Sequence, residues 1–295
     1  MGFFLVMKAE LVRTFIIMRR YWFRTITGMI IGYTMLLMLI LGFVSKGHDV
    51  SPAMAEKFAD AETATNWALG FIIGMVAFGV VGMFTQGLQA MAQNGQLEQL
   101  CMSPHGLVTN FLARATVGSF SSVLTSSLMV WLIAKTVGGT LHADFFPTVT
   151  LMALTFANLI GFGFMVGGLV LVFKQTGQIA VIVRMALLAL AVLATEKIND
   201  WYALGRWLAH ALPITDAAIC LKYVLIHGQM RPVLDRFGNP IKDSSGEIMM
   251  EFVSVFAHSS FFFLVVNCVF WTLVGISCFR IMENWSRHKG TLGAY

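Results

Sequence analysis

Residues 94–104 read NGQLEQLCMSP and form a short polar stretch between two long apolar segments. The stretch contains Glu98, which has no other acidic residue within dozens of positions on either side, and it ends in Ser103-Pro104. The flanking segments, at about 67–91 and 111–137, exceed the roughly 20 apolar residues that cross the hydrocarbon core of a bilayer. The stretch is therefore predicted to be a loop between two membrane spans.

The composition of the whole chain supports this interpretation. Of 295 residues, 57% are hydrophobic and 12% are charged, and the mean hydropathy is +0.76. In soluble domains, about a quarter of the residues are charged. We therefore expect one transmembrane domain over 1–295. Basic residues in such a protein set topology and meet anionic lipid headgroups, so nucleic acid is not expected as a partner.

The apolar runs predict six membrane spans. Lipid offers no partner for an unpaired peptide group, and no alternating pattern favours a barrel, so the spans are expected to be helices of an all-α polytopic membrane protein. Their predicted ranges are 25–44, 67–91, 111–137, 147–173, 179–198 and 253–279.

Basic residues flank the first and the last of these spans. An even number of spans puts both termini on one side, and the excess of Lys and Arg predicts that this side is the cytoplasm. Residues 92–110 then form a cytoplasmic loop. The flanking residues are Lys8, Arg13, Arg19, Arg20 and Arg24 before the first span, and Arg280, Arg287 and Lys289 after the last.

Residues 1–24 have the pattern of an amphipathic helix at the cytoplasmic membrane surface. This helix is expected to be either a topological anchor or a lever to a cytoplasmic partner. The apolar stripe is Phe4, Met7, Leu11, Phe15, Met18 and Trp22, with Glu10, Arg13, Arg20 and Arg24 opposite.

Residue patterns of known catalytic sites are missing from the sequence. The chain has no G-x-x-x-x-G-K-[ST], H-E-x-x-H or G-x-S-x-G motif, and its histidines and cysteines lack ligand spacing. We therefore expect no catalytic, cofactor or metal site. No acid falls at mid-membrane, which disfavours an ion-coupled transporter. Arg114 and Arg184 are expected to snorkel to the headgroups.

Glycines are concentrated in the second and fourth spans. Small residues at such spacing let helices approach closely, within one chain or at a seam between two chains. Asn158 and Asn267 fit either a cavity lining or hydrogen bonds between helices, and we favour the bonds. The glycines proposed for this packing are Gly70, Gly74, Gly161, Gly163 and Gly167.

The segment 199–252 is predicted to lie outside the cell. It is rich in Trp, Leu and Ala and is broken at Leu212-Pro213, which predicts two short helices, too short to cross and therefore re-entrant or interfacial. Asn239-Pro240 and Ser244-Ser245-Gly246 indicate a small hairpin after them.

Two motifs resemble those of a known family. Gly95-Gln96-Leu97-Glu98-Gln99-Leu100, followed by Met102-Ser103-Pro104, resembles the G-T-L-E-Q-L…S/T-P signature that follows the second span of ABC exporter permeases of the second membrane-domain type. Ala211-Leu212-Pro213-Ile214-Thr215 is similar to the L-P-L-T of their external region, so Leu212, Pro213 and Thr215 are expected to mark the re-entrant turn.

This resemblance implies an architecture and partners. Such permeases have six spans, an interfacial N-terminal helix, cytoplasmic termini and re-entrant helices between spans five and six, and they lie in the plasma membrane, the inner membrane of a bacterium. Two permeases, as two copies or as paralogues, form the path among membrane lipids. Two separate ATPase subunits bind beneath and hold ATP and Mg²⁺.

The resemblance also implies that the loop after span two forms a coupling helix that docks on the ATPase. Gly95 would open its turn, Leu97, Leu100 and Met102 would offer apolar contacts, and Glu98 would pair with a basic residue. Gln99 and Ser103 complete the motif, and Pro104 would end it. Relatives carry a charged Arg/Glu run before the glycine, whereas this chain has Gln89, Gln93 and Asn94.

The favoured function is therefore a non-enzymatic subunit of an ATP-driven exporter for an amphipathic, lipid-linked or drug-like molecule. The alternatives are a stand-alone secondary transporter or channel, and a membrane-embedded enzyme acting on lipids. The enzyme would need a polar catalytic cluster, which the sequence does not show.

Overall fold

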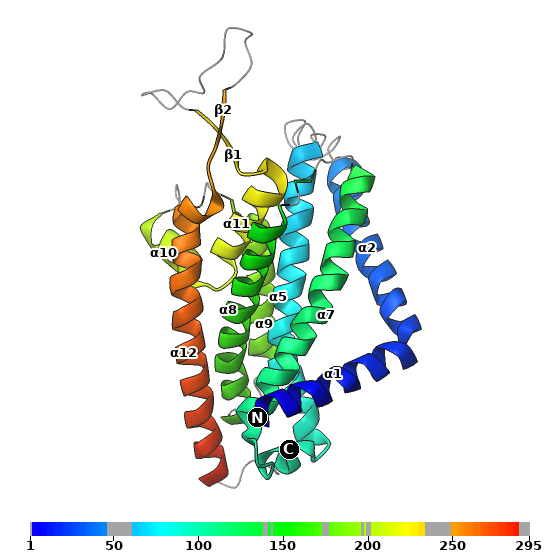
Figure 1. The fold of residues 1–295 in the computed structure, drawn as a ribbon, viewed down its shortest axis with the longest axis vertical. Helices are drawn as coiled ribbons and strands as arrows, with labels where there is room; N and C mark the ends of the chain where they lie inside the picture. Colours follow the sequence, from blue (N-terminus) through cyan, green and yellow to red (C-terminus); the bar gives the residue numbers. More distant parts are fainter. Residues whose placement is uncertain are drawn as a thin grey trace.

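The computed structural model describes residues 2–45, 61–137, 141–142, 144–172, 177–195, 198, 202–233 and 249–288, and helices make up most of them (Figure 1). The helices are α1 (Gly2–Arg20), α2 (Trp22–Ser45), α5 (Ala61–Gln93), α6 (Gln96–Cys101), α7 (Gly106–Val137), α8 (Phe145–Val172), α9 (Gly177–Leu193), α10 (Ala203–Ala211), α11 (Thr215–His227) and α12 (Ser259–His288). Strands β1 (Met230–Pro232) and β2 (Met250–Phe252) and a 3-10 helix (Val255–Ala257) complete the described elements.

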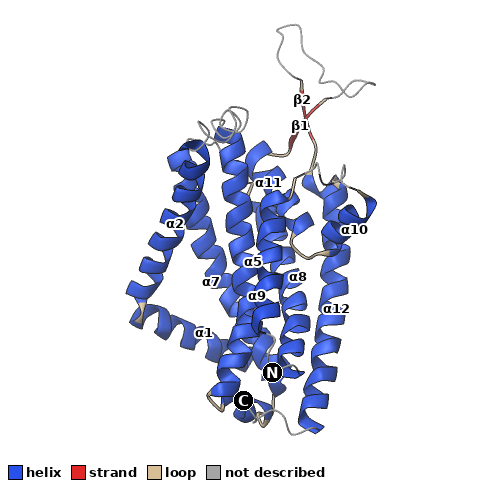
Figure 2. Cartoon of the chain, turned by 180° about the vertical axis from the view of Figure 1, so that it is seen from behind, coloured by secondary structure: helices blue, strands red, loops and turns tan. Residues whose placement is uncertain are grey.

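The long helices run lengthwise and form a bundle with α5 and α8 at its centre. Figures 1 and 2 show α7 and α9 beside α5, α12 beside α8, and α1 with α2 as an angled arm on the other side. The short helix α6 lies at one end, here called the α6 end, together with α1 and the last turns of α12. Strands β1 and β2 lie at the opposite end, here called the hairpin end.

Four buried phenylalanines join the central helices toward the α6 end. Phe84 of α5 lies 4.7 Å from Phe164 of α8, centroid to centroid, and Phe164 lies 5.2 Å from Phe279 of α12. Phe111 of α7 contacts Phe84 and Phe279 at 6.1 and 6.5 Å. Aromatic pairs at such separations add to the energy of burial, so this cluster fixes the four helices relative to one another.

The structure supports an all-α membrane protein without confirming six spans. Among the described residues, α5, α7, α8 and α12 are long and apolar enough to cross a membrane, and the bent pair α10–α11 would make a fifth span. Within α2 and α9, only the shorter stretches Thr25–Met38 and Gln178–Leu193 are apolar helices in this sense. At 1.5 Å per residue, the 17 residues of α9 reach about 26 Å, slightly less than a hydrocarbon core of about 30 Å. The number six stays a prediction.

Two predicted spans had wrong boundaries. The span at 179–198 ends early, because α9 stops at Leu193 and the carbonyls of Val192 and Ala194 accept hydrogen bonds from Lys222 Nζ at 3.1 and 2.8 Å. The span at 253–279 begins late, at Ser259, since Met250–Phe252 pairs with β1 and Ser254 caps the 3-10 helix. In both places the regular helix ends beside polar bonds; after Leu193 the sequence itself turns polar at Thr195-Glu196-Lys197, whereas before Ser259 it stays largely apolar.

The predicted hairpin is present as the antiparallel pair β1–β2, in which Arg231 lies opposite Glu251. The turn residues 239–246 lie outside the described part. Gln229 holds the base of the hairpin: its side chain donates to Asp144 Oδ2 at 2.7 Å and accepts from the Val255 amide at 3.0 Å. The hairpin is therefore tied to the start of α8.

Helix α1 packs across α7, and most of its predicted apolar stripe is exposed. Phe4 and Phe15 are 70% and 68% exposed, whereas Glu10 and Thr14 are half-buried against the bundle. The helix ends at Arg20, earlier than the predicted bound at residue 24, and Trp22, 60% exposed, already starts α2. The position of this helix at a membrane surface stays a prediction, which the exposed apolar side chains favour.

Candidate functional site

The loop between α5 and α7 contains a short helix, α6, as the motif predicts. Gly95 has φ +68°, a left-handed conformation that glycine adopts without steric cost, so the chain turns directly after α5. A second turn follows α6, with the Ser103 amide bonded to the Leu100 carbonyl at 3.2 Å, and Gly106 at φ +70° starts α7. Pro104 is exposed within this second turn.

Leu97 of α6 lies on the side of the helix that faces the bundle, whereas it was expected to offer a contact to a partner. This side chain is 0% exposed and belongs to the same buried cluster as Met91, Leu107 and Phe111, so it faces the bundle, and its contact with a partner stays a prediction. Leu100 is half-buried against that cluster, whereas Met102 is 79% exposed. Helical periodicity alone does not say which side of so short a helix faces the bundle.

Gln99 of α6 and Met102, which lies in the turn directly after α6, are both exposed. The side chain of Glu98 lies outside the described part, and its role stays a prediction.

The C-terminal end of α12 anchors α6 to the bundle. Arg287 donates from Nη2 to the Cys101 carbonyl at 3.4 Å and to Glu283 Oε1 at 2.5 Å. Glu283 is 7% exposed, so its carboxylate fixes the guanidinium that holds α6. The i,i+4 spacing of Glu283 and Arg287 is a signal in the sequence for the bond between these two side chains. No signal points to the bond of Arg287 with the Cys101 carbonyl, because Cys101 is 186 residues away.

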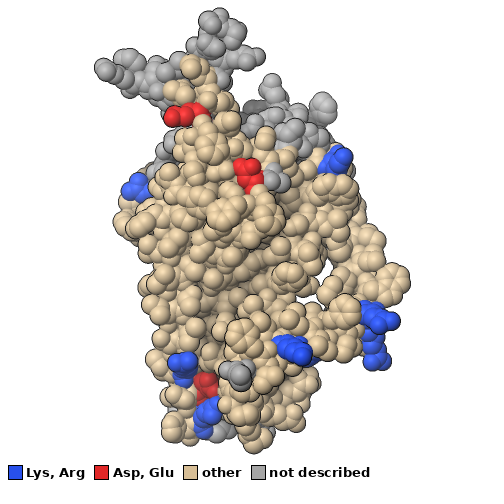
Figure 3. All heavy atoms as spheres, viewed as in Figure 1, with Lys and Arg blue, Asp and Glu red and all other residues tan. Residues whose placement is uncertain are grey.

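A polar hollow of about 320 Å³ separates α6 from α1 and α7. Glu10 and Arg13 of α1, which form an ion pair at 3.2 Å, line it together with Arg114 of α7. Gln96 and Gln99 line its α6 side. Figure 3 shows Lys and Arg at this end and over α1, with a wide uncharged band across the middle of the same face among the described residues.

The second predicted site, the break at Leu212-Pro213, lies between α10 and α11, which are bent by 81°. Side chains of α8 and α12 form hydrogen bonds with the backbone at this turn. Asn158 Nδ2 donates to the Pro213 carbonyl at 2.9 Å and Asn267 Nδ2 to the His210 carbonyl at 2.5 Å, which confirms that these asparagines bond between helices. The bond from Asn267 satisfies a carbonyl that the end of α10 leaves unpaired, and the bond from Asn158 satisfies one in the turn that follows.

Two more contacts at this turn were not predicted from the sequence. Trp271 Nε1 donates to the Ala211 carbonyl at 3.0 Å, and His210 Nδ1 lies 2.8 Å from Asp216 Oδ1. Asp216 is 1% exposed and Thr215 is fully buried beside it. Only the fold brings these groups together, because Trp271 is 60 residues from its partner in sequence.

Replacing Asn158 by leucine is expected to lower the free energy of unfolding by about 1–3 kcal/mol, the cost of a buried carbonyl without its donor. The expected structural effect is a looser turn. It is measured by the unfolding midpoint and by maleimide labelling of the buried Cys220 of α11, in a background with the other cysteines replaced by alanine.

Thr155→Val is the matched control for Asn158→Leu. Thr155 is also buried in α8, but among the described residues its hydroxyl bonds only to the Leu151 carbonyl of its own helix at 2.7 Å. The control should retain the wild-type midpoint and a protected Cys220. Equal behaviour of the two variants would show that the turn does not depend on Asn158.

The predicted packing glycines all lie against helices of the same chain. A Cβ at Gly70 would lie 2.8 Å from the Ala191 carbonyl of α9, and one at Gly74 would lie 3.0 Å from Leu188. Gly161 abuts Trp271 and Thr272 of α12, whereas Gly163 and Gly167 abut Phe84 and Leu88 of α5. A seam between two chains at these glycines stays a prediction.

Arg184 of α9 does not snorkel as expected. It is 4% exposed, its Nε donates to the Phe78 carbonyl of α5 at 2.9 Å, and its guanidinium lies 3.6 Å from the centre of the Phe78 ring. Gly82 leaves the space that this guanidinium occupies. The arginine therefore cross-links two helices by a hydrogen bond and a cation–π contact.

Comparison with protein families gives one match, and it covers most of the chain. The family model of the ABC-2 type transporter matches residues 6–225, which includes α6 and the turn at Pro213. Neither the comparison with curated proteins nor that with solved structures returned a match. The residues that the structure describes include no group of three His, Cys, Asp or Glu that could hold a metal. The chain belongs to the ABC-2 type transporter family, whose members are multi-pass membrane components of ABC transporters and not themselves catalytic.

Proposed function

We propose that the chain is the membrane-spanning subunit of an ATP-driven exporter in a bacterial inner membrane. Two such subunits form the path, and two ATPase subunits, which hold ATP and Mg²⁺, bind at the α6 end. The α6 end faces the cytoplasm in this proposal, which the basic residues at that end support.

The observation that carries the proposal is the way α6 is held. Its inner side is buried through Leu97, and its end is bonded to Arg287 of α12; its outer side is exposed at Gln99, which also lines the hollow beside α1, and at Met102 in the turn after the helix. A partner that presses on this outer side moves α5, α7 and α12 together, because α6 contacts all three helices. Movement of α6 would therefore be passed on to the membrane-spanning helices.

The test is the double variant Gln99→Ala/Met102→Ala in the full chain. We expect the amount of ATPase that co-purifies with the tagged chain from its native membranes to fall about tenfold, the factor that corresponds to a loss of roughly 1.4 kcal/mol at the interface. ATP hydrolysis by the purified complex should fall with it. The unfolding midpoint should stay unchanged, since both side chains are exposed.

Gln93→Ala, an exposed glutamine at the end of α5 and outside α6, is the control and should keep full association. Glu98→Gln is a separate arm that tests the predicted charge. Wild-type association and hydrolysis in the double variant would contradict the proposal. Transport by the purified chain alone, driven by an ion gradient, would favour a stand-alone secondary transporter.

A further inference from the structure

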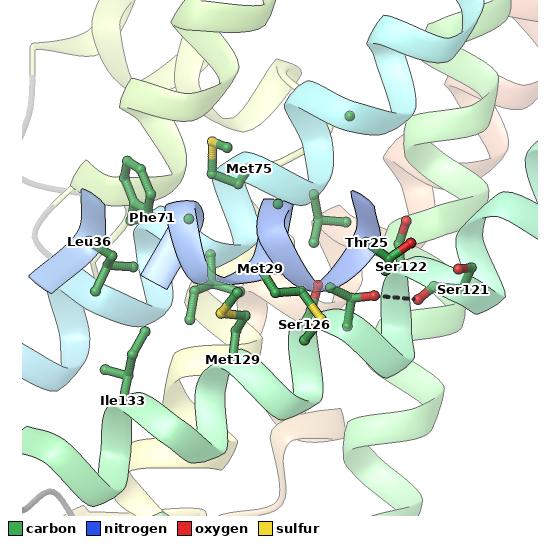
Figure 4. A pocket seen from close by; sticks show the side chains of 16 residues that line it. Thr25, Met29, Leu36, Phe71, Met75, Ser121, Ser122, Ser126, Met129 and Ile133 are labelled. Atoms are coloured by element: carbon green, nitrogen blue, oxygen red, sulfur yellow. Dashed lines mark hydrogen bonds between the residues drawn. The ribbon is translucent and has the colours of Figure 1, made fainter. Parts of the chain in front are cut away.

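A cavity of about 340 Å³ lies between α2, α5 and α7, far from α6 and from the Pro213 turn. Its volume falls within the range of about 300–1,000 Å³ that is usual for small-molecule sites. The two ends of the cavity differ in chemistry, as Figure 4 shows. Hydroxyls gather at the end nearer to α1, and apolar side chains close the other end: Thr25, Ser121 and Ser122 against Leu36, Phe71 and Ile133.

Contacts of the α1–α2 arm bound the cavity toward the hairpin end and toward the α6 end. Toward the hairpin end, Leu36 is buried with Ile72 and Ile133, and Tyr33 bonds to Thr136 of α7 at 2.6 Å. Toward the α6 end, α1 packs across α7. The space between these two attachments is therefore part of the fold, because α2 is held at Tyr33 and Leu36 and, through α1, at its start.

Glycines keep this space open. A Cβ at Gly28 of α2 or Gly79 of α5 would meet no atom within 4 Å, whereas at Gly70 and Gly74 of the same α5 it would meet the backbone of α9 at 3.0 Å or less. The glycines of α5 thus have two roles: those facing α9 allow close packing, and Gly79 leaves room. Met29, Met75 and Met129, which also line the cavity, are flexible side chains that adapt to different ligand shapes.

The lining carries hydrogen-bonding groups but no charge. Thr125 bonds to the Ser121 carbonyl of its own helix at 3.1 Å, and Ser121 to Met18 Sδ at 3.8 Å. In the part of the chain that the structure describes, no hydrogen bond joins the hydroxyl of Ser122 or Ser126 to another residue. At membrane depth such hydroxyls gain energy from a bound polar group, whereas a charged group would find no counter-ion.

We propose that this cavity binds an uncharged amphiphile, with a hydroxyl- or carbonyl-bearing head at Ser122 and Ser126 and a single apolar chain extending toward Leu36 and Ile133. The inference rests on the proposed function, because it names the class of molecule that the exporter carries. Binding itself needs no ATPase, so it is measured on the chain alone.

The probe is a long-chain monoacylglycerol that carries a diazirine in its chain, added to the purified full-length protein in phosphatidylcholine nanodiscs. We expect saturable photolabelling of peptides of α2, α5 and α7, suppressed by unlabelled monoacylglycerol. The fatty acid with the same chain and diazirine should label these peptides roughly tenfold less, because its carboxylate would be unpaired.

Gly79→Leu should fill the cavity and reduce the labelling roughly tenfold. Gly87→Leu on the same helix is the matched control: its Cβ also meets nothing within 4 Å, but Gly87 does not line the cavity, so labelling should persist. The double variant Ser122→Ala/Ser126→Ala should also weaken the labelling. Because it removes atoms and adds none, it replaces Gly79→Leu as the test if that variant fails to fold.

Labelling that does not saturate, or that survives both Gly79→Leu and the double serine variant, would show that the cavity holds only bulk membrane lipid and would overturn the inference. Equal labelling by the fatty acid would overturn the assignment of an uncharged head. Saturable labelling in a chain that captures no ATPase would leave the site standing and contradict the exporter role alone.

Discussion

Replacing Gly275 by alanine should lower the free energy of unfolding by about 3 kcal/mol, at the upper end of the usual cost of overpacking. Gly275 of α12 lies directly against Gly161 of α8, and a Cβ at Gly275 would overlap the Gly161 carbonyl oxygen. A flexible side chain can move aside, but a helix backbone cannot do so without moving the helix. The variant must therefore push α8 and α12 apart.

The consequences of this separation reach two other contacts of α12. One helical turn further on, Phe279 packs on Phe164, and one turn back, Trp271 donates to the Ala211 carbonyl at the bent turn. Both need α12 at its present distance from α8. We expect a loss of cooperativity as well as stability, measured as a broader transition at lower denaturant in an SDS titration of mixed micelles.

Gly87→Ala is the matched control for Gly275→Ala. Its Cβ would meet nothing within 4 Å, and alanine favours a helix interior over glycine by up to about 1 kcal/mol, so this variant should equal or slightly exceed the wild type. An unchanged midpoint for Gly275→Ala would mean that α8 and α12 are not in backbone contact.

Replacing Leu97 by alanine should cost about 2–5 kcal/mol, as is usual for a fully buried leucine. Leu97 is 0% exposed and fills the space between the end of α5 and the start of α7. The loop around it is expected to lie in water, where removing apolar area from solvent stabilises most strongly. The unfolding midpoint of the full chain and proteolysis of the 94–106 loop measure the effect.

Met102→Ala is the comparison, because its side chain is 79% exposed and its loss should leave the midpoint within about 0.5 kcal/mol of the wild type. Both variants should lose ATPase binding, Leu97→Ala through unfolding of α6 and Met102→Ala through the lost contact. A stable Leu97→Ala protein would show that α6 does not depend on this side chain.

Much of the architecture could be predicted from residue order. The apolar runs place α5, α7 and α8 within a few residues of their observed bounds, because a helix in lipid must bond its own backbone and needs length and apolar side chains. Pro213 predicts the break between α10 and α11, because it cannot continue a helix. Gly95 predicts the turn before α6, since the left-handed conformation there suits glycine.

The ends of two helices could not be predicted in this way. Helix α9 ends at Leu193, where Lys222 bonds to the carbonyls of Val192 and Ala194, and the largely apolar stretch before Ser259 contains the β2 strand, which pairs with β1. In both cases a partner distant in sequence competes with the helix for the same backbone groups. An apolar run carries no trace of that competition.

The sequence by itself therefore determined the class of protein through its apolar composition, the polar loop after α5 through its motif, whose resemblance implied the helix α6, and the break at Pro213 through local backbone chemistry. The tertiary structure decided that Leu97 faces inward, that Asn158 bonds to the Pro213 carbonyl, and that Gly79 faces a cavity while Gly74 faces α9. Periodicity tells which residues share a face of a helix, but the neighbour of that face depends on how all the helices pack.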